Sequence, residues 1–284
     1  MKNQTIRLLA LMAALALVIA ACGGGGADPA EDLLAAVEDE GVLTVSTDPA
    51  YPPQSFLNDE TGEYEGFDID VATEIAERLG VEVAWEAPAW ETITAGSWGG
   101  RWDLSVGSMT VTPERSEVLD FSAPYYYTPA VIAVGADDSA VSDLTTDLDG
   151  QTIAVCGACT YDFYLQGDLV IPGESFDFVI DDAQIVTTDT DSTALEQLAQ
   201  GRVQAAMSSL TTIQAAIDSG MAIKIVGDPL FYEPLAAAAD GSSDLSGDAF
   251  IERVSEIIDE MHSDGTLTDL SNEWFGVDLT KKTS

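Results

Sequence analysis

Basic residues are scarce in this sequence. It contains 10 Lys and Arg against 50 Asp and Glu, which gives a formal net charge of -40 at pH 7. Loss of a leader that carries Lys2 and Arg7 would leave 8 basic residues and a net charge of 8 minus 50, or -42. Nucleic acid is excluded as a partner, because phosphate binding requires a basic face. The acidic residues are spread along the chain and indicate a solvated, strongly negative surface.

Histidine and cysteine are also scarce. His262, the single histidine, is predicted on the outer face of a helix and lies far in sequence from Cys156 and Cys159, so the three residues make a poor zinc set. We predict no metal, no cofactor and no nucleophile–base pair. In an oxidising extracytoplasmic space, the Cys156-x-x-Cys159 pair is most simply a small local disulfide. A thioredoxin-type redox site is the alternative, although such a pair normally opens a helix in a small redox fold.

The first 22 residues have the pattern of a secretory signal. Lys2 and Arg7 precede an apolar run of about 13 residues, which is too short for a permanent membrane-spanning helix. The run ends at Ile19-Ala20-Ala21-Cys22, which resembles the lipobox of bacterial lipoproteins; a buried cysteine in an ordinary signal core is the alternative. The resemblance implies that Cys22 is acylated and anchors the protein to the outer face of the cell membrane. Residues 23–29 would then be a flexible tether.

Strand and helix patterns alternate along the rest of the chain. Strands are predicted over residues 42–47, 81–85, 104–108, 152–156, 185–187, 203–208 and 223–226, and near 178–180. Helices are predicted over 70–79 with Asp70 as N-cap, 90–95, 212–219, 248–262 and 267–275, from residue 160, and from the capping-box tetrad Thr193-Ala194-Leu195-Glu196. This alternation predicts an α/β fold with parallel strands and right-handed crossovers.

The two runs of alternating elements predict two lobes. Residues 124–134 would run from the first lobe into the second and residues 227–239 would run back, so the first lobe is discontinuous in sequence. The expected organisation is a signal peptide over 1–22, a tether and first helix over 23–40, lobe 1 over 41–131 and 228–284, and lobe 2 over 132–227.

Arg115 lies where local rules predict the start of a helix. Thr112 is a good N-cap and Pro113 suits the first helical position, so Arg115 falls in the first turn. An anionic ligand there would meet free backbone N–H groups, the positive end of the helix dipole and a guanidinium fork, which together form a carboxylate clamp. The alternative is a surface arginine that pairs with Glu114, Glu117 or Asp120.

Several motifs, taken in order and spacing, resemble the family 3 extracytoplasmic solute-binding proteins of amino-acid-type ABC transporters. They are Gly41-Val42-Leu43-Thr44-Val45, Asp48 with Tyr51-Pro52-Pro53, Gly66-Phe67-Asp68-Ile69-Asp70, Ser108-Met109-Thr110-Val111-Thr112-Pro113-Glu114-Arg115, Phe121-Ser122-Ala123-Pro124-Tyr125 and Gly201-Arg202. The resemblance covers nearly the whole mature chain. It implies a type II periplasmic-binding clamshell, with two lobes that are each a mainly parallel sheet flanked by helices, and a monomer that binds its ligand between them.

The same resemblance implies a set of ligand-binding residues. Arg115 would hold a ligand carboxylate, assisted by the strand end Ser108, Met109 and Thr110. Tyr51 and Trp90 would be aromatic walls, and Asp48 would meet a polar or cationic ligand group; simple packing and a solvated loop are the respective alternatives. Cys159 and Thr160, in the loop of the second lobe, would add further contacts.

One position departs from the family pattern. Relatives place an aspartate that pairs with the ligand's α-ammonium where this chain has Ser209. A neutral hydroxyl forfeits a charge-assisted bond of about 1.5 to 3 kcal/mol. Either another acid, such as Asp48 or Asp189, reaches the ammonium, or the ligand is not a standard α-amino acid.

The resulting prediction is a lipid-anchored binding protein. It would capture a small zwitterionic or cationic carboxylated solute by lobe closure and present it to an ABC permease. One alternative is an enzyme of the cyclohexadienyl-dehydratase type on the same fold, which would need a proton donor facing the ligand. The other is a ligand-sensing receptor module, which is normally followed by a transmembrane segment and a signalling domain, whereas this sequence ends at Ser284.

Overall fold

The computed structural model describes residues 32–282, so the predicted signal peptide and Cys22 lie outside the described residues. The strands are β1 (Val42–Ser46), β2 (Ala50–Tyr51), β3 (Ser55–Leu57), β4 (Tyr64–Glu65), β5 (Glu82–Glu86), β6 (Leu104–Thr110), β7 (Leu119–Gly135), β8 (Thr152–Cys156), β9 (Gln184–Thr188), β10 (Ala205–Ser209) and β11 (Ile223–Asp240). The helices are α2 (Leu33–Glu40), α3 (Phe67–Leu79), α4 (Trp90–Thr94), α5 (Leu144–Asp147), α6 (Thr160–Gln166), α7 (Asp191–Ala199), α8 (Leu210–Asp218), α9 (Asp248–Asp264) and α10 (Thr266–Phe275), with a short 3-10 helix, η2 (Arg115–Glu117).

Eight strands form one mixed sheet in the order β5-β1-β6-β11-β7-β10-β8-β9. β1 is parallel to β5 and β6, which together make the first strand group. β8 is parallel to β9 and β10, which make the second strand group. The predicted α/β class with a mainly parallel sheet is confirmed.

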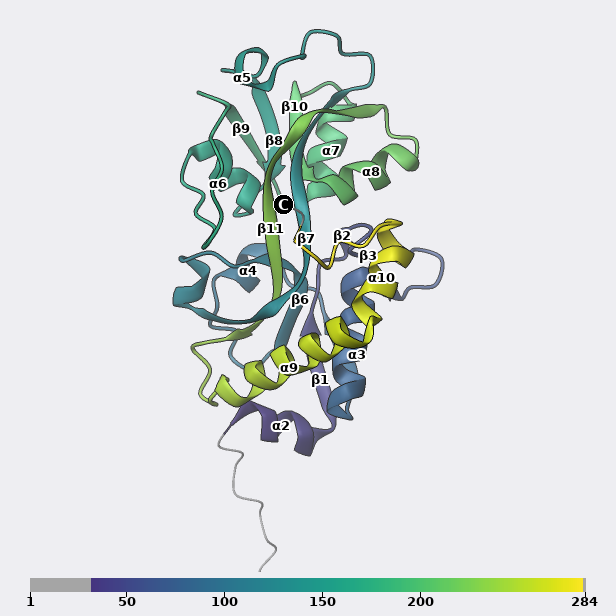
Figure 1. The fold of residues 1–284 in the computed structure, drawn as a ribbon, viewed down its shortest axis with the longest axis vertical. Helices are drawn as coiled ribbons and strands as arrows, with labels where there is room; N and C mark the ends of the chain where they lie inside the picture. The colour runs from purple at the N-terminus through teal and green to yellow at the C-terminus, as the bar shows by residue number, and fades with distance from the viewer. Residues whose placement is uncertain (1–31, 283–284) are drawn as a thin grey trace, which may run out of the picture. The chain divides into compact units, whose positions relative to one another are not determined.

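The long strands β7 and β11 join the two strand groups (Figure 1). They pair with each other in antiparallel fashion; β11 also pairs with β6 and β7 also pairs with β10. Their ladder is interrupted between the pair Val226 and Ile132 and the pair Phe231 and Ala130, so residues 227–230 have no partner on β7. Both strands therefore run from one group to the other, with an irregular segment between.

Helices cover both faces of the second strand group and of the part of β7 that pairs with it. Alternate residues of β7 enter different cores, because side chains of a strand point to opposite faces. Ala130 and Ile132 pack with residues of α6, whereas Val131 and Ala133 pack with residues of α7 and α8. Figure 1 shows α6 on one side of these strands and α7 and α8 on the other.

The first strand group also has two cores. Leu43 and Val45 of β1 pack with apolar residues of α2, α3 and α9 on one face. On the other face Met109 of β6 packs with Trp98 and Trp102 from the segment that follows α4. Among helices formed by residues 32–282, none is both long and apolar enough to span a bilayer.

The predicted starts of α3 and α7 were wrong because a different residue caps each helix. α3 begins after Gly66 rather than Asp70, whose carboxylate instead accepts a bond from Trp274 Nε1 at 2.6 Å. Gly66 has a φ of 132°, and a Cβ there would lie 2.3 Å from the carbonyl oxygen of Gln54, so only glycine fits. α7 is capped by Thr190, whose side chain accepts from the N–H of Thr193.

The strand predicted near residues 178–180 was also wrong. This segment belongs to no strand and has no sheet neighbour. Its Val179 N–H donates to the hydroxyl of Tyr164 at 3.1 Å, and Phe178 packs against the Tyr164 ring while remaining 41% exposed. β-branched and aromatic content alone does not make a strand when no partner is within reach.

The C-terminal part packs back across the molecule. His262 was predicted on an outer face but is half-buried, with Nε2 3.0 Å from the Pro124 carbonyl oxygen. After α10, Leu279 accepts a bond from the Tyr127 N–H at 2.8 Å, and Lys282 Nζ lies 2.6 Å from Glu174 Oε1. The tail thus links β7 to a loop of the second strand group.

Candidate functional site

One pocket is lined by residues from both strand groups, such as Ser108 of β6 and Cys156 of β8, and by residues of the segments around them. Its walls surround about 440 Å³ of space, part of it open to solvent. Eight residues predicted to bind ligand line this pocket, namely Asp48, Tyr51, Trp90, Ser108, Thr110, Arg115, Cys159 and Thr160. Motifs that are far apart in sequence are therefore brought together around a common space.

Met109 and Ser209, also predicted as site residues, do not line the pocket. Met109 lies between Ser108 and Thr110 on β6, so its side chain points to the opposite face and is fully buried. Ser209 is fully buried as the N-cap of α8, where its Oγ accepts from the N–H of Thr212 at 3.1 Å. This cap also places the start of α8 earlier than the predicted residue 212.

Arg115 is the cation of the pocket. It is only 4% exposed, and Nη1 and Nη2 donate to the carbonyl oxygens of Thr110 and Ala158 at 2.9 and 3.0 Å. Its guanidinium carbon lies 5.2 Å from the centre of the Trp90 ring, within range of a cation–π contact. Burial lowers the Arg115 pKa to about 10, so the side chain remains charged at neutral pH.

The predicted helix at Arg115 is a three-residue 3-10 helix. So short an element has no significant macrodipole, and that part of the anion-binding argument was wrong. The Thr112 hydroxyl does accept from the Arg115 N–H at 3.3 Å, as expected of a cap. No ion pair among residues 32–282 includes Arg115, so the alternative of a surface arginine paired with nearby acids is not what the structure shows.

Four carboxylates share the pocket with this single guanidinium: Asp48, Asp189, Asp191 and Glu233 all line it. Burial raises the pKa of Asp48 and of Glu233, and it raises the pKa of Asp191 to about 7. Burial disfavours the charged form of an acid, and neighbouring carboxylates add to this effect for Asp191. The pocket is therefore poised to accept a positive charge.

Glu233 and Asp191 are important pocket residues that the sequence motifs did not identify. Glu233 on β11 is 2% exposed and accepts bonds from the hydroxyls of Thr110 and Tyr161, both at 2.8 Å, and from Thr160. Asp191 is 5% exposed and accepts a bond from the Ser208 hydroxyl. A lone acid ahead of the apolar run 235–239 was the signal available for Glu233.

Gln54 is a further residue that the motifs did not single out, and it links the segment between β2 and β3 to the start of α8. Its side chain is fully buried; Nε2 donates to Ser209 Oγ at 3.1 Å and to Thr211 Oγ1 at 2.8 Å, and Oε1 accepts from Thr212 at 3.2 Å. At Ser209, where the family resemblance implied an acid, the structure therefore has a neutral contact with Gln54. Ser209 is fully buried and its hydroxyl is bonded to Gln54.

A second polar network supports the pocket wall at Ser108. Asp68 of α3 is fully buried and accepts from Ser108 Oγ at 2.7 Å and Tyr125 OH at 2.8 Å. The Tyr125 oxygen in turn accepts from the Ser108 N–H at 2.9 Å. These bonds hold Ser108 at a φ of 53°, a left-handed conformation that is unfavourable for serine. Burial raises the Asp68 pKa to about 7.

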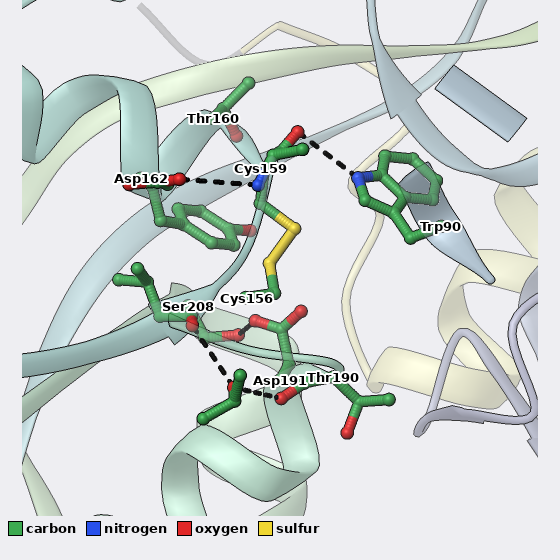
Figure 2. Close-up of a disulfide and its surroundings, with 12 residues drawn as sticks. Trp90, Cys156, Cys159, Thr160, Asp162, Thr190, Asp191 and Ser208 are labelled. Atoms are coloured by element: carbon green, nitrogen blue, oxygen red, sulfur yellow. Dashed lines mark hydrogen bonds between the residues drawn. A yellow bond between two sulfur atoms is a disulfide. The ribbon is translucent and has the colours of Figure 1, made fainter. Parts of the chain in front are cut away.

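The predicted disulfide between Cys156 and Cys159 is confirmed. Cys156 ends β8, Cys159 is the N-cap of α6, and both line the pocket. One carboxylate oxygen of Asp191 and the two sulfur atoms lie within 4.8 Å of one another (Figure 2). Because both sulfurs are bonded to each other, they offer no thiolate to a metal ion.

Comparisons with known proteins agree with the fold and the motifs. Residues 43–277 match the sequence family of bacterial extracellular solute-binding proteins, family 3. The chain is 30% identical over 282 residues to the probable amino-acid-binding protein YxeM of Bacillus subtilis, which covers 99% of this chain and 97% of that protein. It is 28% identical over 283 residues to the L-cystine-binding protein TcyJ of Escherichia coli, with 99% and 100% covered.

A solved structure with the same fold is that of the ancestral amino acid-binding protein AncCDT-1, a precursor of cyclohexadienyl dehydratase. It superposes with a TM-score of 0.73 at 28% sequence identity and covers 85% of this chain and 99% of that one. Sequence pattern, relatives and fold agree. This chain belongs to the bacterial extracellular solute-binding proteins of family 3.

Proposed function

We propose that this protein is a lipid-anchored binding protein that captures a small cationic amino acid in the pocket around Arg115 and delivers it to an ABC permease. The observation that carries this proposal is the composition of the pocket, which is lined by one buried guanidinium and four carboxylates. The relatives named above as amino-acid-binding and L-cystine-binding proteins support an amino-acid ligand.

Arg115 supports a carboxylate on the ligand. Two of its five N–H groups donate to backbone carbonyls, and these bonds fix the plane of the guanidinium. The remaining donors are available to a planar anion, which a guanidinium grips through parallel bonds. A ligand carboxylate at this point would also neutralise a buried charge.

The four acids support a positive charge on the rest of the ligand. With every group ionised, the side chains that line the pocket have a net charge of 1 minus 4, or -3. A ligand with one carboxylate and two cationic groups, such as arginine or lysine, would lower this charge to -2, whereas glutamate would raise it in magnitude. Asp191 and Glu233 can receive the α-ammonium that Ser209 cannot reach, so a standard α-amino acid is compatible with the site.

Binding would proceed by closure of two lobes, for which we propose residues 41–131 with 228–284 and residues 132–227. Direct contacts already link the two sides around the pocket: Tyr51 OH and Tyr161 OH are 3.4 Å apart, and Ser192 Oγ donates to the Ala50 carbonyl at 2.7 Å. A ligand that bonds to both sides would favour the closed state by its differential affinity. The permease would then recognise the closed monomer.

Calorimetric titration of the purified protein with arginine, lysine, glutamine, cystine and glutamate tests the ligand class. We expect arginine or lysine to bind at least about tenfold more tightly than glutamine, a difference of about 1.4 kcal/mol. Equal affinity for glutamine and arginine would contradict the role of the acidic pocket, and tighter binding of cystine would identify a different ligand class.

Lipid anchoring needs a separate test. Residues 1–22 would be cleaved as a lipoprotein signal, and Cys22 would carry the acyl chains that hold the protein at the membrane. Replacement Cys22→Ser should move the protein from the membrane fraction to the extracytoplasmic soluble fraction. Membrane retention of this variant would contradict the proposed anchor.

A dehydratase on the same fold has one supporting observation. Asp191 is a buried carboxyl in the pocket with a pKa raised by burial to about 7, so it could donate a proton to a bound substrate. We propose binding rather than catalysis, because the named close relatives are binding proteins. Conversion of a carboxylated cyclohexadienol during incubation with the protein would reverse this assignment.

A further inference from the structure

The disulfide in the pocket wall has features that a purely structural crosslink does not need. Cys156 is almost fully buried at the end of β8, but Cys159 is half-buried and opens α6 as its N-cap. Both residues line the pocket rather than a core. A Cys-x-x-Cys pair in a pocket wall at a strand–helix junction has the spacing found in redox-active disulfides.

An acid–base group lies next to the two sulfurs. One oxygen of Asp191 is within 4.8 Å of both sulfur atoms, and the Asp191 side chain is held in place by the Ser208 hydroxyl (Figure 2). Burial gives this carboxyl a pKa of about 7, so both protonation states are populated at neutral pH. Such a group can take a proton from an incoming thiol and return it to a departing sulfur.

We propose that the Cys156–Cys159 disulfide is redox-active and exchanges with small cationic thiols that enter the pocket, with Asp191 as the proton carrier. The Asp191 carboxylate first removes the proton of the incoming thiol. The thiolate attacks Cys159 Sγ, the more accessible sulfur; a new sulfur–sulfur bond forms there, and the Cys156–Cys159 bond breaks. Cys156 leaves with the electron pair and takes the proton from Asp191.

A second molecule of the same thiol completes the exchange. It attacks the thiol-derived sulfur of the mixed disulfide, which releases Cys159 as a thiol and the incoming molecules as their own disulfide. The protein gains two electrons and two protons, and two thiols become one disulfide. In the reverse direction, the reduced protein would cleave a small cationic disulfide, so the thiol is the reductant and its disulfide the oxidant.

The charge of the pocket defines the chemical class of the thiol. Asp48, Asp189, Asp191 and Glu233 line the same space as the sulfurs, and Arg115 is the single guanidinium beside them. A pocket of one charge sign raises the local concentration of opposite charges by about 10 to 1,000-fold. A thiol with an ammonium group should therefore react faster than a neutral thiol, and an anionic thiol should react slowest.

Exchange would also change the ligand clamp. Ala158, between the two cysteines, has a φ of 57°, and its carbonyl accepts bonds from Arg115 Nη2 at 3.0 Å and Trp90 Nε1 at 3.3 Å. A non-glycine residue with this φ needs a constraint to stay there. Opening of the disulfide would release that constraint and withdraw the carbonyl that holds both side chains.

The first experiment compares cysteamine, 2-mercaptoethanol and mercaptoacetate as probes. The purified protein is incubated with each thiol, and the reaction is quenched with acid, alkylated and analysed by mass spectrometry. For each thiol, the rate constant per thiolate with the protein is divided by the rate constant of the same thiol with a small uncharged reference disulfide. We expect cysteamine to react at least about tenfold faster than mercaptoacetate. Equal normalised rates, or reduction only at the rate of global unfolding, would overturn the proposal.

The second experiment uses variants. Replacement Cys156→Ser should trap a mixed disulfide on Cys159, whereas Cys159→Ser should leave the buried Cys156 unreactive. We expect Asp191→Asn to slow exchange roughly 100-fold and to remove the inflection of its pH profile near pH 7. The matched variant Asp48→Asn removes a charge from the same pocket, so it should weaken the preference for cysteamine but retain the inflection.

The groups that face Asp191 must be considered in that pH profile. They are the hydroxyl of Ser208, the carboxylates of Asp48 and Glu233, and the phenols of Tyr51 and Tyr161. An inflection that persists in Asp191→Asn would assign it to one of these acids and overturn the role of Asp191. Exchange can fail while amino-acid titration succeeds, so this activity and the proposed function are tested independently.

Discussion

Arg115 is the residue on which the proposed ligand pocket depends. The Thr112-Pro113-Glu114-Arg115 sequence was sufficient to single it out, because this motif occurs in order with other family motifs. The neighbours of Arg115 were not predictable in the same way. Trp90 was expected at the same site from the family motifs, but Ala158 and Glu233 come from distant parts of the chain, and only the fold brings them to Arg115.

Replacement Arg115→Ala should abolish calorimetrically detectable binding of a carboxylated amino acid. Each charge-assisted bond contributes about 1.5 to 3 kcal/mol, so loss of a pair corresponds to a decrease in affinity of at least about 100-fold. The matched variant Arg115→Lys retains the charge but not the fork and should bind with intermediate affinity. Unchanged affinity in Arg115→Ala would exclude Arg115 as the carboxylate ligand.

Buried carboxyls should make the protein less stable as the pH rises. Burial raises the pKa values of Asp68 and Asp191 to about 7, well above the 3.8 that such groups have when unfolded. The native state therefore binds more protons between pH 4 and 7, and the free energy of unfolding should fall across this window. Urea denaturation at several pH values measures this slope.

The variant Asp68→Asn separates this residue from the other acids. The free energy of unfolding should fall between pH 4 and 7 in both proteins. The fall should be smaller by roughly 1 to 3 kcal/mol in the variant than in the wild type. The exposed replacement Glu63→Gln serves as the control and should leave the slope unchanged. If both variants keep the wild-type slope, Asp68 is not neutral in the native protein at low pH.

Helices and strands were easier to predict than their ends. Apolar periodicity identified α3, α9 and α10, because burial of one helix face dominates their formation; a capping-box tetrad indicated α7, and α8 was also predicted. Their first residues were misplaced where Gly66, Thr190 and Ser209 act as caps, since several nearby residues were plausible caps. The absent strand near 178–180 shows that pairing depends on a neighbour that sequence alone does not reveal.

The N-terminus of α8 should be sensitive to loss of the Ser209 hydroxyl. Replacement Ser209→Ala removes the cap and a bond from Gln54, so the free energy of unfolding should fall by about 1 to 2 kcal/mol. Ser263→Ala, in an exposed position of α9, is the control and should change stability by less than about 0.5 kcal/mol. Equal effects of the two replacements in chemical denaturation would contradict the role of Ser209.

At the scale of the whole molecule, negative charge is the dominant property. Within residues 32–282, Arg78 pairs with Glu74, Glu260 and Asp264 at once, because cations are so few. Composition predicted this imbalance completely, since net charge depends on no structural detail. Composition did not reveal that four of the acids line one pocket, because that depends on the fold.

Added salt should stabilise the protein. Raising NaCl from 0.1 to 1 M shortens the screening length from about 10 to 3 Å and weakens repulsion across a chain with a net charge of -40. We expect the free energy of unfolding to rise by roughly 1 to 2 kcal/mol, a large fraction of ordinary domain stability. The effect should shrink at pH 4, where many carboxylates are protonated. A salt-independent transition at pH 7 would contradict this prediction.

The contact between Lys282 and Glu174 affects how the protein should be handled in the laboratory. A purification tag fused after Ser284 would be separated by only two residues from the Lys282 ammonium, which is paired with Glu174. A run of histidines there would compete with Lys282 for the same glutamate. Affinities measured on C-terminally tagged material would then report on the tag as well as on the pocket.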